Sequence, residues 1–181
     1  IEEKAAAKKT IDPVTLCATL GKVLPKDAIY VDETITHRGY LMKHLQNQTA
    51  QSYFRVHGGL GQGLGVALGV RLANPKRPVV SVIGDGSFMY NPITQSLALA
   101  KHAELPILIV VFNNNGYQAM KREHQTYYPD GVAQARNIFY GEPVTDLEYS
   151  ELIKPFGGYG RRVEKPADLA PAIKEGLAAV K

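Results

Sequence analysis

Two polar side chains follow directly after two apolar segments of the chain, where they could bind a metal ion. Asp85 comes after residues 79–83, and Asn114 comes after residues 107–112. A carboxylate and an amide oxygen, together with a backbone carbonyl, suit a hard cation such as Mg²⁺, whose coordination is usually completed by phosphate oxygens and water. These residue types therefore indicate a site for a diphosphate and its metal ion.

The two apolar segments have the composition of buried parallel strands. Both are short, rich in β-branched residues and almost free of polar side chains, as in strands that are covered on both faces. Between them, Asn91 and Pro92 fit the N-cap and the first residue of a helix. Such a β-α-β unit has parallel strands and a right-handed connection. It places Asp85 and Asn114 at the C-terminal edge of the sheet, where open α/β folds bind ligands.

An alternative explanation of the polar segments is that they are simple turns. Aspartate and asparagine tolerate turn conformations, and Asp85 and Asn114 could serve only as turn formers. The neighbouring glycines, however, also allow backbone N–H groups to approach an anion closely. Because the two segments follow neighbouring strands, their coincidence favours a ligand site over two unrelated turns.

The whole pattern predicts an α/β fold, a doubly wound three-layer αβα sandwich with a mostly parallel central sheet. Residues 1–10 have the composition of a linker or frayed helix, so the domain is expected at 11–181. Further strands are expected at 28–31, 53–56 and 161–163, helices at 13–24, 38–45, 118–124, 145–154 and 167–180, a glycine-rich helical pattern up to residue 72, and a loop at 125–140.

Composition narrows the class of protein. The chain has 181 residues, of which 45% are hydrophobic and 21% charged, as in a single globular domain. Its net charge of +4 comes from dispersed basic residues, which argues against a nucleic-acid partner. No apolar run is long enough to span a membrane and no signal peptide opens the chain, so a cytoplasmic location without a membrane partner is expected. The single cysteine, Cys17, lies in an apolar helical pattern and is predicted to be buried rather than nucleophilic.

Taken together, the motifs resemble the diphosphate-binding (PP) domain of thiamine diphosphate (ThDP) enzymes. GDGS at 84–87 followed by NN at 113–114 resembles the GDG…NN signature of that family, with a slightly longer interval than usual. The resemblance extends upstream to HGGLG at 57–61 and downstream to GGYG at 157–160. It covers nearly the whole chain and is greatest for the acetolactate synthase and benzoylformate decarboxylase group.

The resemblance implies a ligand set for ThDP and Mg²⁺. The metal ion would be held by the side chains of Asp85 and Asn114 and the carbonyl of Gly116, with two diphosphate oxygens and a water molecule. Backbone amides of the two loops would hold the phosphates. The other cofactor contacts that the resemblance implies are Thr34, Thr36, Gly58, Leu60, Gly84, Gly86, Ser87 and Tyr117.

Four of these residues carry more specific expectations. The Gly58 carbonyl would accept a hydrogen bond from the aminopyrimidine of the cofactor. Leu60 would force the cofactor into the bent shape that brings its amino nitrogen near C2, unless it is an ordinary core leucine. The hydroxyls of Thr34 and Thr36 would contact phosphate oxygens or, as an equally open alternative, cap the helix at 38–45.

By the same resemblance, the chain is the cofactor-binding domain of a ThDP- and Mg²⁺-dependent 2-oxo-acid decarboxylase or carboligase. No catalytic residue is assignable in it, because similar enzymes take their catalytic glutamate from a pyrimidine-binding domain, usually on a partner subunit. Glu33 and Glu123 are expected to be surface or loop residues, whereas His57 and Met120 are candidates for lining the pocket of a small 2-oxo acid. A homodimer or homotetramer is expected.

Two alternatives accompany this interpretation. The chain could be the cofactor-binding subunit of a two-chain ThDP enzyme similar to sulfopyruvate decarboxylase, or a non-catalytic doubly wound module. Retention of Asp85, Asn114 and Gly116 argues against the second alternative. The resemblance also implies that the last strand of the domain and the pyrimidine-binding domain are missing from this sequence.

Overall fold

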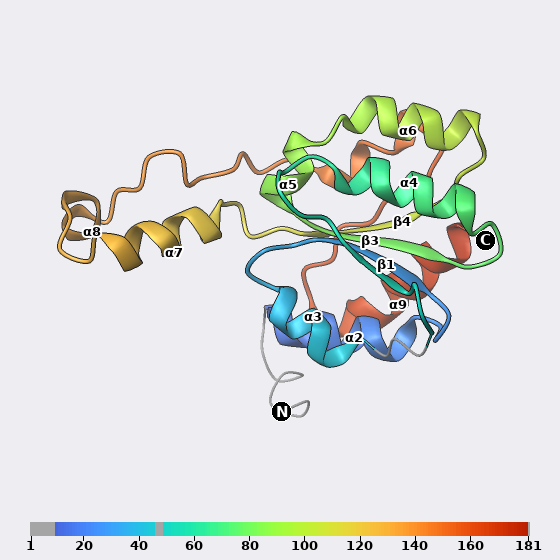
Figure 1. The fold of residues 1–181 in the computed structure, drawn as a ribbon, viewed down its shortest axis with the longest axis horizontal. Helices are drawn as coiled ribbons and strands as arrows, with labels where there is room; N and C mark the ends of the chain where they lie inside the picture. The colour runs from blue at the N-terminus through green and yellow to red at the C-terminus, as the bar shows by residue number, and fades with distance from the viewer. Residues whose placement is uncertain (1–9, 46–48, 181) are drawn as a thin grey trace.

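The computed structural model describes residues 10–45 and 49–180, so the predicted linker lies, except for Thr10, outside the described residues. At its centre is a four-stranded sheet in the order β2-β1-β3-β4, with every neighbouring pair parallel (Figure 1). The strands are β1 (Ile29–Glu33), β2 (Tyr53–Arg55), β3 (Val79–Gly84) and β4 (Leu108–Phe112). This arrangement confirms the predicted parallel strands on either side of the Asp85 segment.

Helices cover both faces of the sheet and form the two outer layers of the sandwich (Figure 1). One layer contains α2 (Pro13–Val23), α3 (Arg38–His44) and α9 (Pro166–Ala179), and the other contains α4 (Gly63–Ala73), α5 (Asp85–Tyr90) and α6 (Ile93–His102). The predicted doubly wound α/β class is therefore confirmed. None of the described helices is both long and apolar enough to cross a bilayer.

Alternating side chains of β3 build the core on both sides of the sheet. Val80 and Val82 belong to the cluster that contains Cys17 of α2, whereas Val79 packs in the cluster on the α4 side. This alternation is the two-residue period of a strand covered on both faces. Cys17 is fully buried as predicted, and burial raises the pKa of its thiol to about 12, so the reactive thiolate is not formed near neutral pH.

The segment after β4 forms a helical arm that stands away from the body of the domain (Figure 1). The arm contains α7 (Gln118–Tyr127) and α8 (Val132–Arg136), neither of which has a buried residue. The helix predicted at 118–124 is confirmed, but the prediction of a continuous loop at 125–140 is wrong in part. Helix α7 continues three residues further than predicted, and α8 forms beyond the turn that follows it.

The helix predicted at 145–154 is wrong. Two short 3₁₀ turns, η1 (Tyr149–Glu151) and η2 (Lys154–Phe156), occupy this region instead. The Glu148 carboxylate accepts the Ser150 hydroxyl at 2.6 Å and makes no side-chain cap. Gly157, with φ 81°, ends the second turn.

The strand predicted at 161–163 is also wrong. Residues 160–164 run beside β4 without joining the sheet, and a groove of about 1190 Å³ lies along β4, these residues and α9. The guanidinium of Arg162 in this segment lies between three exposed carboxylates, at 3.5 Å from Asp146, 3.4 Å from Glu148 and 3.1 Å from Glu164. These contacts anchor the segment through its side chain rather than through backbone pairing.

Candidate metal and diphosphate site

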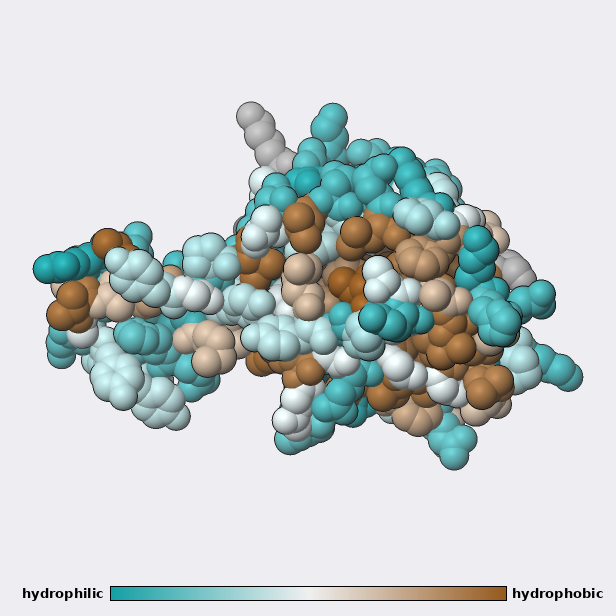
Figure 2. Space-filling view, turned by 90° about the horizontal axis from the view of Figure 1, so that it is seen from above, coloured by the Kyte–Doolittle hydropathy of each residue, from teal (hydrophilic) through white to brown (hydrophobic). Residues whose placement is uncertain are grey.

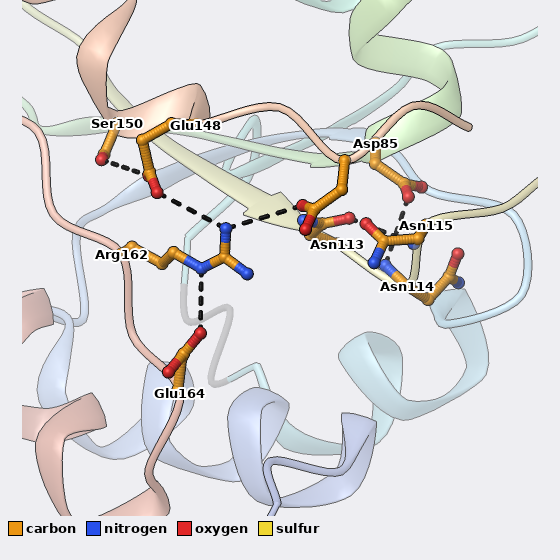
Figure 3. Close-up of polar contacts among 9 residues, drawn as sticks. Asp85, Asn113, Asn114, Asn115, Glu148, Ser150, Arg162 and Glu164 are labelled. Atoms are coloured by element: carbon orange, nitrogen blue, oxygen red, sulfur yellow. Dashed lines mark hydrogen bonds and ion pairs between the residues drawn. The ribbon is translucent and has the colours of Figure 1, made fainter.

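Asp85 lies at the carboxyl end of β3, as the first residue of α5. The GDGS segment, expected as a turn, is therefore the beginning of a helix. The Asp85 side chain is only 2% exposed and points at the loop after β4 (Figure 3). Its Oδ1 accepts the Gly86 N–H at 2.8 Å, and its Oδ2 accepts the N–H groups of Asn114 and Gly116 at 3.2 and 3.1 Å. The ends of two neighbouring strands are thus tied together by one carboxylate.

Asn114 belongs to the loop after β4 that the Asp85 carboxylate contacts. Its Oδ1 also accepts the Gly116 N–H at 3.1 Å, so the oxygens of Asp85 and Asn114 share one donor. The bond from the Gly116 N–H to Oδ1 of Asn114 is of the kind that asparagine makes in turns, which agrees with the alternative that Asn114 serves as a turn former. The contacts of Asp85 span 29 and 31 positions of the sequence, however, and a local turn does not account for them.

The chemistry of these donors fits a hard cation. The Asp85 carboxylate and the Asn114 amide oxygen converge on the Gly116 N–H, and the carbonyl of the same residue accepts the Gln118 N–H at 2.9 Å. Among the described residues, none forms an ion pair with Asp85. No group of three His, Cys, Asp or Glu side chains in the same ranges could hold a metal ion. A single buried carboxylate with neutral oxygens is the donor set that Mg²⁺ takes when phosphates supply further ligands.

Gly86 is required by the close approach of an aromatic ring. A Cβ atom at this position would lie 2.5 Å from Cε1 and 2.6 Å from Cδ1 of Tyr117. The Tyr117 ring is also held edge-on to Tyr90 at 6.2 Å. The Tyr117 N–H, which was expected to bind a phosphate, donates to the Glu142 carbonyl at 2.7 Å, so a phosphate would have to compete with that bond.

We expect Gly86→Ala to lower the free energy of unfolding by about 1–3 kcal/mol, because the added methyl group overpacks against the Tyr117 ring. Urea denaturation of the domain measures this loss. Gly84→Ala is a matched control with a cost below about 0.5 kcal/mol, since a Cβ there meets no atom within 4 Å. In a Tyr117→Ala background Gly86→Ala should add no further loss, and an equal loss in both backgrounds would contradict this explanation.

Neither predicted threonine caps the following helix. Helix α3 has His37 as its N-cap residue, without a side-chain cap bond, so the capping alternative is wrong. Thr34 is 1% exposed and donates its hydroxyl to Oδ1 of Asp32 at 2.6 Å, a bond that a phosphate would have to replace. Thr36 is half-buried, and its phosphate contact stays a prediction.

The segment at 57–61 forms an exposed loop before α4. Gly58 and Gly61 have φ angles of 98° and 96°, which side chains other than glycine rarely adopt. Leu60 is 38% exposed, so the alternative of an ordinary core leucine is wrong. His57 is exposed, as is Met120 on the arm, and a pocket wall formed by either residue would have to be completed by another domain.

Glu33 is the functional candidate that the sequence interpretation missed. The expectation that it is a surface or loop residue is wrong, because it ends β1 and is 3% exposed, whereas Glu123 is exposed as expected. Its carboxylate accepts the N–H groups of Gly61, Gln62 and Gly63. The two-residue period of β1 could have revealed this, since it places Glu33 on the same face as the core residues Ile29 and Val31.

Asn91 also differs from its predicted role. The N-cap of α6 is Pro92 rather than Asn91, and it has no side-chain cap bond. Asn91 is buried and uses its side chain elsewhere, since Nδ2 donates to Oε2 of Glu33 at 2.8 Å and Oδ1 accepts the Leu64 N–H at 3.0 Å. It therefore joins the beginning of α4 to the end of β1.

The family model, the curated relatives and the solved structures that this chain is similar to agree on one family. A family model described as "Thiamine pyrophosphate enzyme, C-terminal TPP binding domain" matches residues 35–181. The chain is similar to benzoylformate decarboxylase of Pseudomonas aeruginosa (29% identity over 92% of this chain and 30% of that protein) and to acetolactate synthase isozyme 3 large subunit of Escherichia coli (29% over 94% and 29%). Among solved structures, a ThDP-dependent 4-hydroxybenzoylformate decarboxylase of Rhodococcus jostii superimposes with a TM-score of 0.84 and 31% identity, over 96% of this chain and 32% of that one.

These matches define what part of its relatives the chain represents. It spans about three tenths of the length of each of these three proteins, and the matched family model is that of their cofactor-binding end. The fold, the loops at the carboxyl ends of β3 and β4, and the family match agree with one another. The chain belongs to the thiamine pyrophosphate enzyme family, as its C-terminal domain that binds thiamine pyrophosphate, which is the same molecule as ThDP.

Proposed function

We propose that this chain is the cofactor-binding domain of a ThDP- and Mg²⁺-dependent decarboxylase or carboligase that acts on a small 2-oxo acid. The observation that carries the proposal is the buried Asp85 carboxylate, which is directed across two strand ends at the Asn114 loop. The names of its relatives, benzoylformate decarboxylase and acetolactate synthase, support the reaction class.

In this proposal the residues of the chain bind and orient the cofactor. Asp85, Asn114 and the Gly116 carbonyl hold Mg²⁺, and backbone amides of the two loops hold the diphosphate. When bound, the cofactor would supply a nucleophilic carbon for addition to the 2-oxo group and a positively charged ring as acceptor for the electron pair released with CO₂. The Gly58 carbonyl would accept a hydrogen bond from the aminopyrimidine of the cofactor, and Leu60 would support its bent shape.

An exposed apolar face supports the expected partner domain. Figure 2 shows apolar side chains gathered on the side of the molecule formed by α4 and α6. Leu72 of α4 is 68% exposed and Leu99 of α6 is 50% exposed, and a hollow of about 470 Å³ lies between the two helices. Such a patch marks a contact surface. We propose that a pyrimidine-binding domain, from a second subunit of a homodimer or homotetramer, covers it.

The test uses the full-length protein that contains this domain. Titration calorimetry should detect ThDP binding that requires Mg²⁺, and a screen with pyruvate, benzoylformate and other 2-oxo acids should detect CO₂ release. Binding of ThDP that is independent of divalent cations would contradict the metal site. Absence of any ThDP binding would contradict the proposed function as a whole.

A further inference from the structure

The carboxylate of Glu33 is buried beside the loop that is proposed to face the aminopyrimidine. Its Oε1 accepts the N–H groups of Gly61 at 2.6 Å and Gln62 at 3.0 Å. Its Oε2 accepts the Gly63 N–H at 3.0 Å and the Asn91 amide at 2.8 Å. Each oxygen therefore has two donors, and no described Lys, Arg or His forms an ion pair with this carboxylate. Its negative charge is balanced by three backbone N–H groups and the Asn91 side-chain amide.

These bonds replace the local cap of α4. The N-cap residue, Gln62, makes no side-chain cap, so the first N–H groups of the helix need other acceptors. From β1, Glu33 accepts the N–H groups of Gln62 and Gly63 together with that of Gly61, just before the helix. Asn91 accepts the next, that of Leu64, from the segment between α5 and α6. The direction in which the chain enters α4 is thus fixed from outside the helix.

The same bonds connect the two ends of the proposed cofactor site. Asn91 donates both to Glu33 and to the Ser87 carbonyl, at 2.8 and 2.9 Å, and Ser87 lies in the helix that begins with Asp85. The fit around the carboxylate is tight, because a Cβ at Gly63 would lie 2.5 Å from Oε2 of Glu33. The loop at 58–61 and the Asp85 helix are therefore held at a fixed separation through one carboxylate and one amide.

We propose that Glu33 is a positioning residue, which presets the Gly58–Leu60 turn so that its carbonyl and leucine side chain face the aminopyrimidine of ThDP. The inference rests on the proposed function. Its physical basis is that the shortest of these bonds, at 2.6 Å, holds the N–H of Gly61, the residue that directly follows Leu60 in the chain. Glu33 itself is buried behind the turn and needs no contact with the cofactor.

Glu33→Gln in the full-length protein tests this role. The amide keeps the shape of the side chain, but its Nε2 cannot accept a bond, and whichever way the group is turned it meets two N–H donors. Asn91 cannot relieve the conflict by turning, since its Oδ1 is bound to the Leu64 N–H. We expect the dissociation constant for ThDP with saturating Mg²⁺ to rise by about tenfold or more, and amide hydrogen exchange at residues 58–64 to accelerate in the cofactor-free protein.

Arg77→Gln is the matched control. Arg77 makes three side-chain hydrogen bonds against the four of Glu33, to the Asp27 carbonyl and the hydroxyls of Thr49 and Ser52, and these lie at the opposite end of the sheet. Loss of the Arg77 hydrogen bonds should lower the free energy of unfolding without weakening ThDP binding. Both variants are compared at a temperature at which both remain folded, with Glu33→Asp as a second variant that keeps the charge and shortens its reach.

Each outcome decides the proposal. A rise smaller than about fivefold, equivalent to about 1 kcal/mol, or an equal rise in Arg77→Gln, would overturn the positioning role. Failure of both Glu33 variants to fold would also overturn it, because the carboxylate would then be needed for the fold itself. Absence of ThDP binding by the unaltered protein would instead refute the proposed function, so the two failures are distinguishable.

Discussion

Asp85→Asn in the full-length protein should raise the dissociation constant for ThDP in the presence of Mg²⁺ by more than about 100-fold, because even the loss of a group that only orients a metal ligand typically costs about 10- to 100-fold. Asp85 is the only anionic donor in the proposed set, and the asparagine removes its charge while keeping its shape. Titration calorimetry at several Mg²⁺ concentrations measures the change.

The asparagine variant is preferable to Asp85→Ala. The carboxylate accepts three backbone N–H groups, from Gly86, Asn114 and Gly116, and alanine would leave all three without this acceptor at a cost of about 1–3 kcal/mol for each buried group. The amide oxygen of asparagine can still accept the two from Asn114 and Gly116. Asp146→Asn is the control, since Asp146 is an exposed carboxylate whose partner is Arg162. Unchanged affinity in Asp85→Asn, or an equal loss with and without Mg²⁺, would contradict the assignment of Asp85 as a metal ligand.

The part of the fold that could be predicted is the part whose signal is local. Val79 to Ile83 alternate between the two core faces, and such strands are recognisable from their own residues. Once β3 and β4 are parallel neighbours, the meeting of Asp85 and Asn114 follows from topology alone. The sequence therefore led to the central pair of site residues without any knowledge of tertiary contacts.

The remaining elements depend on partners that are distant in sequence. The segment 161–163 has the composition of a strand, but Arg162 is held by Asp146 and Glu148, which lie 16 and 14 positions earlier. A glutamate is usually a surface residue, but Glu33 is buried because its carboxylate accepts three N–H groups around the start of α4. These groups lie 28 to 30 positions later in the sequence. No local pattern encodes which groups Arg162 and Glu33 contact, although the two-residue period of β1 already places Glu33 on the same face as the core residues Ile29 and Val31.

The apolar face on α4 and α6 leads to the second large expected effect. The double variant Leu72→Glu with Leu99→Glu should weaken self-association of the full-length protein by more than about 100-fold, because each unpaired carboxylate buried in an apolar contact costs several kcal/mol. Both side chains are largely exposed in the isolated domain, so its stability should change little. Sedimentation velocity over a range of protein concentrations measures the association.

The arm supplies the control that distinguishes this face from other contact surfaces. Val132 of α8 is 67% exposed, nearly the same as Leu72, but it lies on the arm and not on the α4–α6 face. If Val132→Glu dissociates the protein while the double variant does not, the subunit contact is made by the arm and the face on α4 and α6 has another role. If the double variant alone dissociates the protein and loses ThDP at the same time, the cofactor site needs the partner that covers this face. That result would explain why Leu60, proposed to support the cofactor, is left 38% exposed by this domain alone.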